Sequence, residues 1–421
     1  MAYHEIAALL GGWPGFELVN VQREDATPAR STARIVLTLQ ALAGHPKTCS
    51  RCGRVVSAVH DISPREVRDL PILDAETWLV VPRARVLCPD CGPTVETVAW
   101  LDRYQRMTTR LAEAIARLCQ VATLTHVAQW YGVGWDTVKQ IDHRALARRL
   151  GPVDLRGLRI IAIDEFAVHR GHRYATIVAD PITKRVLWVG RGRAREDLRV
   201  FFELLGPAGC AQLEAVVADM SPAITNEVHA SCPAAVLVYD RYHVEAKYAQ
   251  EVVDRVRIAE TNRLGRAIPR GAVGGMERTR SRAVLRGARW LLLRNRAHVT
   301  RPKDRIRLRE LLQANRVLFK VYVLKDDLKQ LWHYRQPRAA RRFWRAWYRR
   351  ALASRVPALQ RFAKHLAVRI EGVISHCRYP LNTGFLEGMN NKIKVLKRMA
   401  YGYRHDDYFF LKIRAAFPGI P

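Results

Sequence analysis

The chain has 421 residues, of which 49% are hydrophobic and 26% are charged. This is the composition of a globular protein, and at about 150 residues per domain it predicts two to four domains. The 70 lysines and arginines, 57 of which are arginine, outnumber the 39 acidic residues, so the net charge is +31. This excess excludes an ordinary metabolic enzyme as the first hypothesis and predicts a polyanionic partner, in the first place nucleic acid. A GC-biased genome would explain the preference for arginine, but not the shortage of acids.

The sequence has no membrane character. Its apolar runs, such as residues 290–293, are far shorter than the roughly 18 residues of a spanning helix. The first residues lack the basic region and the long apolar stretch of a signal peptide. We therefore expect a cytoplasmic protein without a membrane partner. Cysteines are reduced in the cytosol, so the eight cysteines are expected to be thiols or metal ligands.

Residues 41–100 are predicted to form a zinc-binding, zinc-ribbon-like module, which follows an N-terminal segment of residues 1–40. Two Cys-x-x-Cys pairs, each followed by glycine, lie 35 residues apart in this module. Four thiolates in two tight turns favour a tetrahedral, structural Zn²⁺, whose closed coordination shell cannot activate water. The predicted ligands are Cys49, Cys52, Cys88 and Cys91. Two unrelated cysteine pairs in a fold without metal are the alternative.

Residues 103–152 are predicted to form a helix-turn-helix DNA-binding domain. Ala128 is small enough for two helices to cross closely, and Gly132 suits the tight turn that follows. Val138 and Ile141 have the spacing of the buried face of the second helix. The opposite side would meet a DNA major groove with Trp135, Asp136, Thr137, Lys139 and Gln140. An ordinary helical hairpin is the alternative.

From residue 156 to 245, short β-rich runs alternate with helical segments, which predicts the first part of an α/β catalytic core. The runs are residues 158–163, 174–179, 185–189, 215–218 and 235–239. Three of them are followed directly by an aspartate, namely Asp164, Asp219 and Asp240. Acids at strand ends meet at the carboxyl edge of a sheet, where α/β proteins build their sites. A role in a turn or a helix cap is the alternative for each of them.

Residues 376–421 are expected to complete the catalytic core with a final helix. Glu387, Asn391, Lys394 and Arg398 are spaced at 4, 3 and 4 residues, so they share one helical face. An acid beside basic groups suits a metal-dependent phosphodiester enzyme, because carboxylates hold Mg²⁺ and basic groups hold phosphates. Three carboxylates around two Mg²⁺ ions, for which Mn²⁺ is expected to substitute, would activate a water or a 3′-hydroxyl for in-line displacement. The basic residues expected to contact DNA are Lys392, Lys394, Lys397 and Arg398.

Residues 246–375 are predicted to form a helical and strongly basic insertion in the catalytic core. Between residues 251 and 350 there are 28 basic and 8 acidic residues. The insertion would grip DNA ends or a partner subunit. Its tryptophans are expected in the helical core, with stacking on an unpaired base as the alternative. They are Trp290, Trp332, Trp344 and Trp347.

The order of these features resembles the bacterial insertion-sequence transposases of the ISL type, the third family of that name. The resemblance covers nearly the whole chain and rests on motifs that follow one another in the same order. They are Ile163-Asp164-Glu165-Phe166, residues 171–176, Asp219-Met220-Ser221-Pro222-Ala223, Asp240-Arg241-Tyr242-His243-Val244, and residues 382–394 continued by residues 397–404. The family implies a ribonuclease-H-like fold, a DDE catalytic triad and binding to the terminal inverted repeats of the protein's own mobile element.

The resemblance also implies how the protein works and with what. A bacterial, nucleoid-associated enzyme would nick double-stranded DNA at the ends of its element and use the exposed 3′-hydroxyl to attack target DNA. Because two element ends must be held together, we expect a homo-oligomer, at least a dimer.

Asp164 and Glu387 are the first and last acids of the implied triad, and the middle acid is Asp219 or Asp240. Strand counting favours Asp219, because it follows the fourth strand, which lies beside the first strand in ribonuclease-H-like transposases. Asp240 would follow the fifth strand, where with His243 it resembles the (C/D)-x-x-H motif of related transposases. The residues expected to support the site are His243 and Asn391.

Three other functions fit parts of the sequence. A DNA-binding repressor or a domesticated, catalytically silent transposase would have lost an acid, yet Asp164, Asp219 and Glu387 are all present. A structure-selective nuclease of the same fold would not need the zinc and helix-turn-helix modules. A recombinase with a serine or tyrosine nucleophile is disfavoured, because no serine or tyrosine has a setting that marks it as one.

Overall fold

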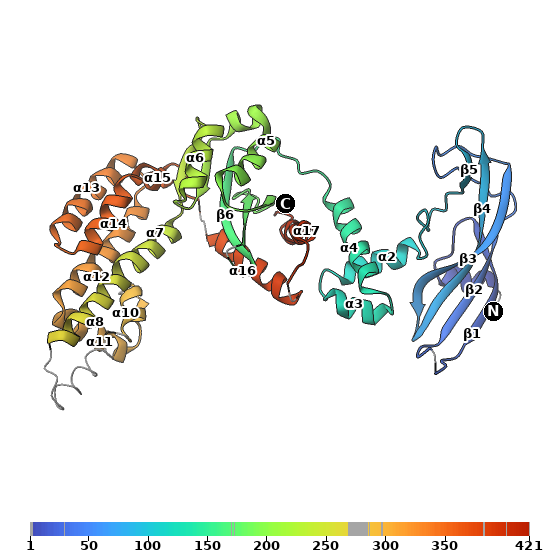
Figure 1. Ribbon diagram of the computed structural model, residues 1–421, viewed down its shortest axis with the longest axis horizontal. Coiled ribbons are helices and arrows are strands. Elements are labelled where there is room, and N and C mark those ends of the chain that lie inside the picture. The colour runs from blue at the N-terminus through green and yellow to red at the C-terminus, as the bar shows by residue number, and fades with distance from the viewer. Residues whose placement is uncertain are drawn as a thin grey trace. The chain divides into compact units, whose positions relative to one another are not determined.

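The computed structural model describes residues 3–28, 30–169, 171, 173–267, 285, 287–295, 298–381, 384–400 and 402–420. It divides into two compact units (Figure 1). The first consists of Met1–Gly151 and Arg398–Gly402, and the second of Pro152–Lys397 and Tyr403–Pro421. Four residues of the predicted motifs lie outside the described residues, namely His172, Asn382, Thr383 and Tyr401. No helix in the described ranges is long and apolar enough to cross a membrane.

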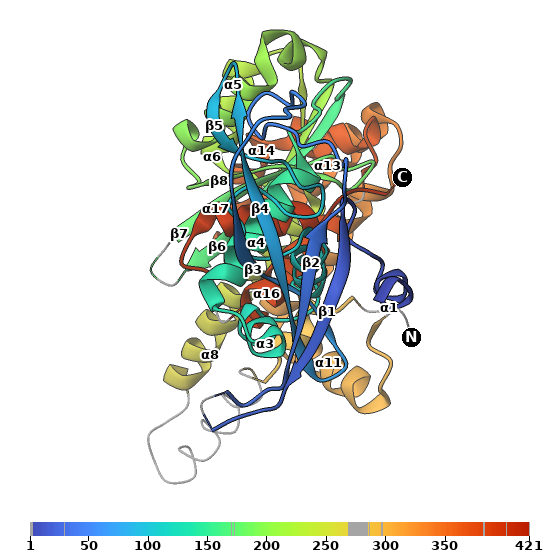
Figure 2. The same ribbon diagram turned by 90° about the vertical axis from the view of Figure 1, so that its right-hand side faces the viewer.

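The first unit begins with a short helix and a five-stranded sheet. These elements are α1 (Tyr3–Leu9), β1 (Phe16–Glu24), β2 (Arg34–Ala41), β3 (Val59–Ile72), β4 (Ala75–Cys88) and β5 (Gly92–Val95). The strand order is β1-β2-β4-β3, and β5 pairs with β4 (Figure 2). β2 pairs in parallel with β4, and Leu37 of β2 is buried in the same core as Leu79 of β4. The predicted N-terminal segment therefore shares one sheet with the predicted zinc module.

Three helices follow in the first unit, α2 (Thr109–Leu118), α3 (Leu124–Tyr131) and α4 (Trp135–Leu150). Gly132 ends α3 with a left-handed backbone at φ 59°, a conformation that glycine adopts without strain. Val127, Val138 and Ile141 are buried in one cluster with residues of α2. The predicted helix-turn-helix is confirmed, and α2 completes its core.

The second unit contains a five-stranded sheet whose strands correspond to the five predicted runs. They are β6 (Ile160–His169), β7 (Arg173–Ala179), β8 (Val186–Arg191), β9 (Ala215–Ala218) and β10 (Val236–Tyr239). The order across the sheet is β10-β9-β6-β7-β8. β6, β9 and β10 are parallel neighbours, whereas β7 pairs antiparallel with β6, and β8 pairs antiparallel with β7. The carboxyl ends of the three parallel strands therefore meet at one edge of the sheet.

Helices cover both faces of this sheet, as the alternation of buried residues along β6 requires. Ile161 and Ile163 share a buried cluster with α5 (Arg195–Gln212) and α6 (Pro222–Ser231). Ala162 and Phe166 point to the other face and share a cluster with α16 (Gly384–Met399) and α17 (Asp406–Ala416). The predicted final helix is thus α16, which lies on one defined face of the sheet.

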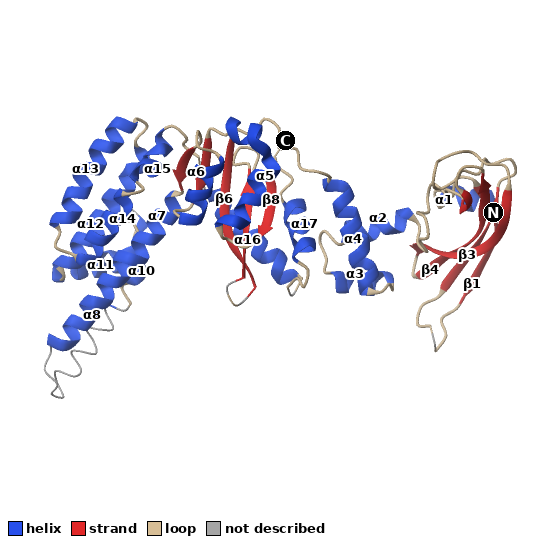
Figure 3. Cartoon of the chain, turned by 45° about the horizontal axis from the view of Figure 1, so that its top comes forward, coloured by secondary structure: helices blue, strands red, loops and turns tan. Residues whose placement is uncertain are grey.

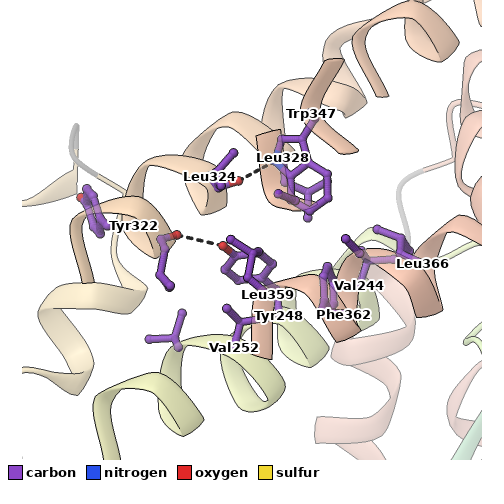
Figure 4. Packing of buried hydrophobic residues seen from close by; sticks show 14 of the residues in the cluster. Val244, Tyr248, Val252, Tyr322, Leu324, Leu328, Trp347, Leu359, Phe362 and Leu366 are labelled. Atoms are coloured by element: carbon purple, nitrogen blue, oxygen red, sulfur yellow. Dashed lines mark hydrogen bonds between the residues drawn. The ribbon is translucent and has the colours of Figure 1, made fainter. Parts of the chain in front are cut away.

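A helical block joins β10 to α16 (Figure 3). Its elements are α7 (Arg241–Tyr248), η1 (Ala249–Asp254), α8 (Arg255–Ala267), α10 (Arg289–Leu293), α11 (Pro302–Ala314), α12 (Arg316–Lys329), η3 (Gln330–His333), α13 (Pro337–Ala353), α14 (Pro357–Ala367), α15 (Ile370–Ile374) and η4 (Ser375–Cys377). In its core, Tyr248 Oη donates to the Val321 carbonyl at 2.9 Å, and Trp347 Nε1 donates to the Leu324 carbonyl at 2.8 Å (Figure 4). These buried polar groups are therefore bonded within the protein, as their removal from water requires.

The tryptophans of this block fall into two groups. Trp344 and Trp347 are buried, as predicted, and the half-buried Trp332 packs against the same core. Trp290 was expected in the core, but its side chain is 67% exposed. The short helix α10 turns Leu291 and Leu292 inward, so the residue before them points to solvent.

Candidate active site

Three aspartates follow the parallel strands of the second unit. In the pairing of β6 with β9, Ile160 lies opposite Ala215 and Ala162 lies opposite Val217. Continued by two residues, the same register places Asp164 opposite Asp219. β10 pairs with β9 up to Tyr239 and Ala218, so Asp240 follows level with Asp219. The three acids therefore lie along one edge of the sheet, as the sequence predicts.

The side-chain alternation of the strands also assigns these acids to a face. Side chains two residues apart on a strand point to the same face, so Asp164 points in the same direction as Ala162 and Phe166. These two residues face α16 and α17. Asp219 has the parity of Val217, which belongs to the same cluster. The face that carries the aspartates is therefore the one against which α16 packs.

One hydrogen bond joins α16 to this edge. Asn390 Nδ2 donates to Asp164 Oδ2 at 2.7 Å, while Asn390 Oδ1 is buried and has no hydrogen-bond partner in the described part of the chain. Asn391, which was expected to support the site, is exposed. Both residues lie one turn after Glu387, and the burial of Leu386 and Met389 turns Asn390 toward the sheet.

Glu387 lies on the same helix but stands apart from the aspartates. Its side chain is exposed and has no hydrogen bond or ion pair with any residue that the structure describes. The sulfurs of the four cysteines in the first unit all lie within 4.8 Å of one another. Within the described ranges, no three carboxylates have oxygens that close together.

Burial and charge perturb the acids at this edge. Asp164 is only 7% exposed, and its burial raises the pKa of its carboxyl group. Burial also raises the pKa of Glu165, and the negative charge of Asp219 raises it further. Glu165 is a fourth acid of the cluster that the implied triad does not include. Arg193 lies 3.9 Å from its carboxylate and partly compensates the charge.

Asp240 and His243 form a pair beside these acids. Asp240 is 3% exposed and caps α7, because its Oδ1 accepts the N–H of Tyr242 at 2.8 Å. His243 Nδ1 donates to Asp240 Oδ2 at 2.9 Å, and this bond is the main reason why the pKa of His243 is raised. The charges of Asp164 and Asp219 raise it further. Both oxygens of Asp240 are therefore engaged in local structure.

Asp219 is bonded differently from Asp240. It is half-buried, and its Oδ1 accepts the N–H of Ser221 at 2.8 Å. Its Oδ2 has no hydrogen bond in the described ranges of the chain. Of these two aspartates, Asp219 thus has the oxygen that is available to a further ligand.

The predicted DNA-contacting residues lie at the surface. On α4, the exposed residues are Trp135, Asp136, Thr137 and Gln140, and Lys139 is half-buried with its Nζ 5.5 Å from the centre of the Trp135 ring. On α16, Lys394 and Arg398 are exposed and Lys397 is half-buried. Lys392 is exposed too, but its Nζ donates to the Ala416 carbonyl at 2.7 Å, which ties α16 to α17.

The four predicted zinc ligands meet in the first unit. The sulfurs of Cys49, Cys52, Cys88 and Cys91 all lie within 4.8 Å of one another, and Cys52 Sγ is 3.6 Å from Cys88 Sγ. Tetrahedral Zn²⁺ with bonds of about 2.3 Å to sulfur requires sulfur separations of about 3.8 Å. A backbone N–H of Cys52 contributes most to lowering the pKa of Cys49 to about 6, which favours the thiolate that binds metal. The cluster therefore fits a structural Zn²⁺.

The chain combines a four-cysteine module, a helix-turn-helix and a sheet with clustered carboxylates, interrupted by a basic helical block. This combination defines a DDE transposase, a DNA-binding enzyme of mobile elements. Family models match each part: residues 45–91 match the zinc-finger of transposase IS204/IS1001/IS1096/IS1165, residues 96–146 match the helix-turn-helix domain of transposase family ISL3, and residues 161–413 match the transposase domain of that family. The chain belongs to the ISL3 family of transposases.

Two relatives match over most of their length. The chain is 45% identical over 418 residues, 97% of both chains, to the transposase for insertion sequence element IS1001 of Bordetella parapertussis. It is 30% identical over 390 residues to the transposase for insertion sequence element IS1557 of Mycobacterium tuberculosis, which covers 88% of this chain and 86% of the relative. The chain is thus an insertion-sequence transposase.

Proposed function

We propose that Asp164, Asp219 and Glu387 are the catalytic acids of this transposase and that they hold two Mg²⁺ ions. The observation that carries the proposal is the hydrogen bond from Asn390 of α16 to Asp164 of β6. This bond holds α16 against the sheet edge that carries the two aspartates. Glu387 lies one turn before Asn390 on the same helix. Its carboxylate is exposed and apart from the aspartates in this structure, and we propose that it joins them when the metal ions bind.

The oxygen donors at this edge suit Mg²⁺, which prefers carboxylate and carbonyl oxygens. Asp219 offers an oxygen that no described residue uses, and Asn390 Oδ1 is buried without a partner. Because burial raises the pKa of Asp164 and Glu165, a cation would relieve the cost of their negative charges. Two bound ions would activate a water or a 3′-hydroxyl and stabilise the leaving oxygen in an in-line displacement.

The other residues of the chain orient this site and hold the DNA. Asp240 fixes the ring of His243, and the hydrogen bond with Asp240 and the charges of Asp164 and Asp219 raise the pKa of this imidazole. The exposed side of α4 would contact the terminal inverted repeats, and Lys394 and Arg398 would contact phosphates near the cut. A homo-oligomer, at least a dimer, would hold the two element ends together.

We assign the catalytic core to the ribonuclease-H-like fold. The arrangement of its sheet supports the assignment, since β7 and β8 lie on one side of β6 and the parallel strands β9 and β10 on the other. Asp219 follows the fourth of the five strands, which pairs with the first.

The test is cleavage by the purified full-length protein of a duplex that contains an end of its element. We expect nicking that requires Mg²⁺ or Mn²⁺ and leaves a 3′-hydroxyl, and we expect Glu387→Gln to abolish it. Glu310→Gln is the matched control, since Glu310 is an exposed acid on α11, away from the sheet edge. Binding of the element end without any cleavage would instead indicate a catalytically silent DNA-binding protein. Full activity of Glu387→Gln would remove Glu387 from the site.

A further inference from the structure

Helix α13 of the helical block is unusually basic. It contains six arginines and no acidic residue. Two of the six are paired with neighbouring helices: Arg341 Nε donates to Glu371 of α15 at 3.1 Å, and Arg350 forms an ion pair with Asp327 of α12. These two pairs attach the helix to the rest of the block.

The other four arginines are Arg338, Arg342, Arg345 and Arg349, and we call them the arginine ridge. All four side chains are exposed, and none has an ion pair or hydrogen bond with a residue that the structure describes. Their high charge is therefore not compensated within the described protein.

The ridge occupies one narrow side of α13. Its members are spaced at 4, 3 and 4 residues, which at 100° per residue confines them to an arc of about 60°. The buried residues of α13 are centred on the opposite side, and they are Ala340, Trp344, Trp347 and Ala351. Packing of these residues, with Trp347 as seen in Figure 4, forces the four guanidinium groups outward.

We propose that the arginine ridge binds the phosphate backbone of duplex DNA independently of sequence. With a rise of about 1.5 Å per residue, the ridge is about 16 Å long, and one DNA strand presents about five phosphates over that length. Guanidinium groups bind phosphates in a bidentate manner. The ridge itself contains no amide or carboxylate side chain that would read base edges.

The position of α13 fits this role. It packs against α15 and η4, which in turn pack against β10, the strand that leads into Asp240. The ridge thus belongs to the same unit as the catalytic carboxylates. DNA binding by the ridge does not depend on which acids form the proposed metal site.

The test compares two full-length variants that each lose four charges, and a third variant that keeps them. The first replaces all four ridge arginines by glutamine. The control replaces four exposed basic residues at and near α11 by glutamine, namely Arg301, Lys303, Arg307 and Arg309. Binding to a random-sequence duplex and to an element-end duplex is measured by fluorescence anisotropy as a function of salt.

Neutralising four phosphate contacts should reduce the slope of log affinity against log salt by about 3.6. Between about 50 and about 200 mM salt, the wild type should therefore lose about 150-fold more affinity than the ridge variant. We expect the reduction on both duplexes, and a clearly smaller one in the control variant. A ridge variant with lysine at all four positions, which keeps the charge, should retain most of the slope and shows whether folding is intact.

Three results would overturn the proposal. If the slope of log affinity against log salt is unchanged in the glutamine variant, the ridge does not contact phosphates. If the oligomeric mass of that variant also changes, the ridge is a subunit interface. Equal losses in the ridge and control variants would mean that overall charge acts, not the ridge. A loss confined to the element-end duplex would indicate sequence-specific contacts.

Discussion

The different bonding of Asp219 and Asp240 leads to a prediction about their roles. Replacing Asp240 by asparagine keeps the cap of α7, because asparagine caps helices as well as aspartate does, but it makes the bond with His243 neutral. The expected loss of unfolding free energy is about 1 kcal/mol. Replacing Asp240 by alanine removes the cap and the charged hydrogen bond, which together are worth about 2.5–4 kcal/mol.

Asp219→Asn should behave in the opposite way. The amide oxygen can still accept the N–H of Ser221, and the residue is only half-buried, so the change in stability should stay within about 0.5 kcal/mol. DNA cleavage should nevertheless be abolished, because an amide cannot replace a carboxylate as a Mg²⁺ ligand of the same charge. Asp240→Asn should retain part of the wild-type cleavage.

Stability and activity are measured on the same preparations, by urea unfolding followed by circular dichroism and by nicking of an element-end duplex. The reasoning is refuted if Asp240→Asn is inactive without being destabilised while Asp219→Asn still cuts. That outcome would make Asp240 the second catalytic acid and Asp219 the turn residue.

Three further predictions concern the metal-binding parts and the charge cluster. The four cysteine sulfurs form a single site, so chelation should release one zinc ion per chain and unfold the turns around Cys49 and Cys88. Metal analysis measures the zinc, and circular dichroism follows the unfolding. A purified protein without zinc would contradict this prediction. In the absence of Mg²⁺ and at neutral pH, Asp164→Asn should raise the melting temperature although it abolishes cleavage. Folding raises the pKa of Asp164, so the ionised carboxylate destabilises the folded protein at every pH above that raised value. A melting temperature of Asp164→Asn below that of the wild type would contradict this prediction. The pKa of His243 is raised by Asp240, so its stabilising effect is fully present below its ordinary value of 6.5 and is lost as the pH rises through the raised value. The destabilisation caused by His243→Gln should thus shrink from about pH 6 to about pH 9, and a difference that grew with pH would contradict the assignment.

The catalytic sheet was largely predictable from the sequence because its signals are local. Five short apolar runs gave the strands, and Asp164, Asp219 and Asp240 directly follow three of them. Parallel strands with a common direction must bring their carboxyl ends to one edge, so the grouping of the acids followed.

Asn390 was not predictable in the same way. Residues three and four positions after Glu387 lie on nearly the same side of a helix, and spacing alone does not decide between Asn390 and Asn391. The decision depends on how Leu386 and Met389 pack against the sheet, which is a tertiary effect.

The strand pairing of the first unit, and the participation of residues before 41 in its sheet, were not predicted because the pairing is non-local. β3 and β4 are each 14 residues long, but Pro64, Pro82 and several arginines interrupt the apolar alternation by which strands are recognised. β2 pairs with β4 rather than with the next strand along the chain, which no short-range pattern indicates.

The most direct test of the proposed site is excision in cells of a marker flanked by the terminal repeats of the element. The wild type should excise the marker, and Asp164→Asn, Asp219→Asn and Glu387→Gln should fail to do so although they bind the repeats. Excision by any of these three variants at the wild-type level would contradict the proposed catalytic acids. A wild-type protein that binds the repeats and never excises the marker would contradict catalysis by this chain.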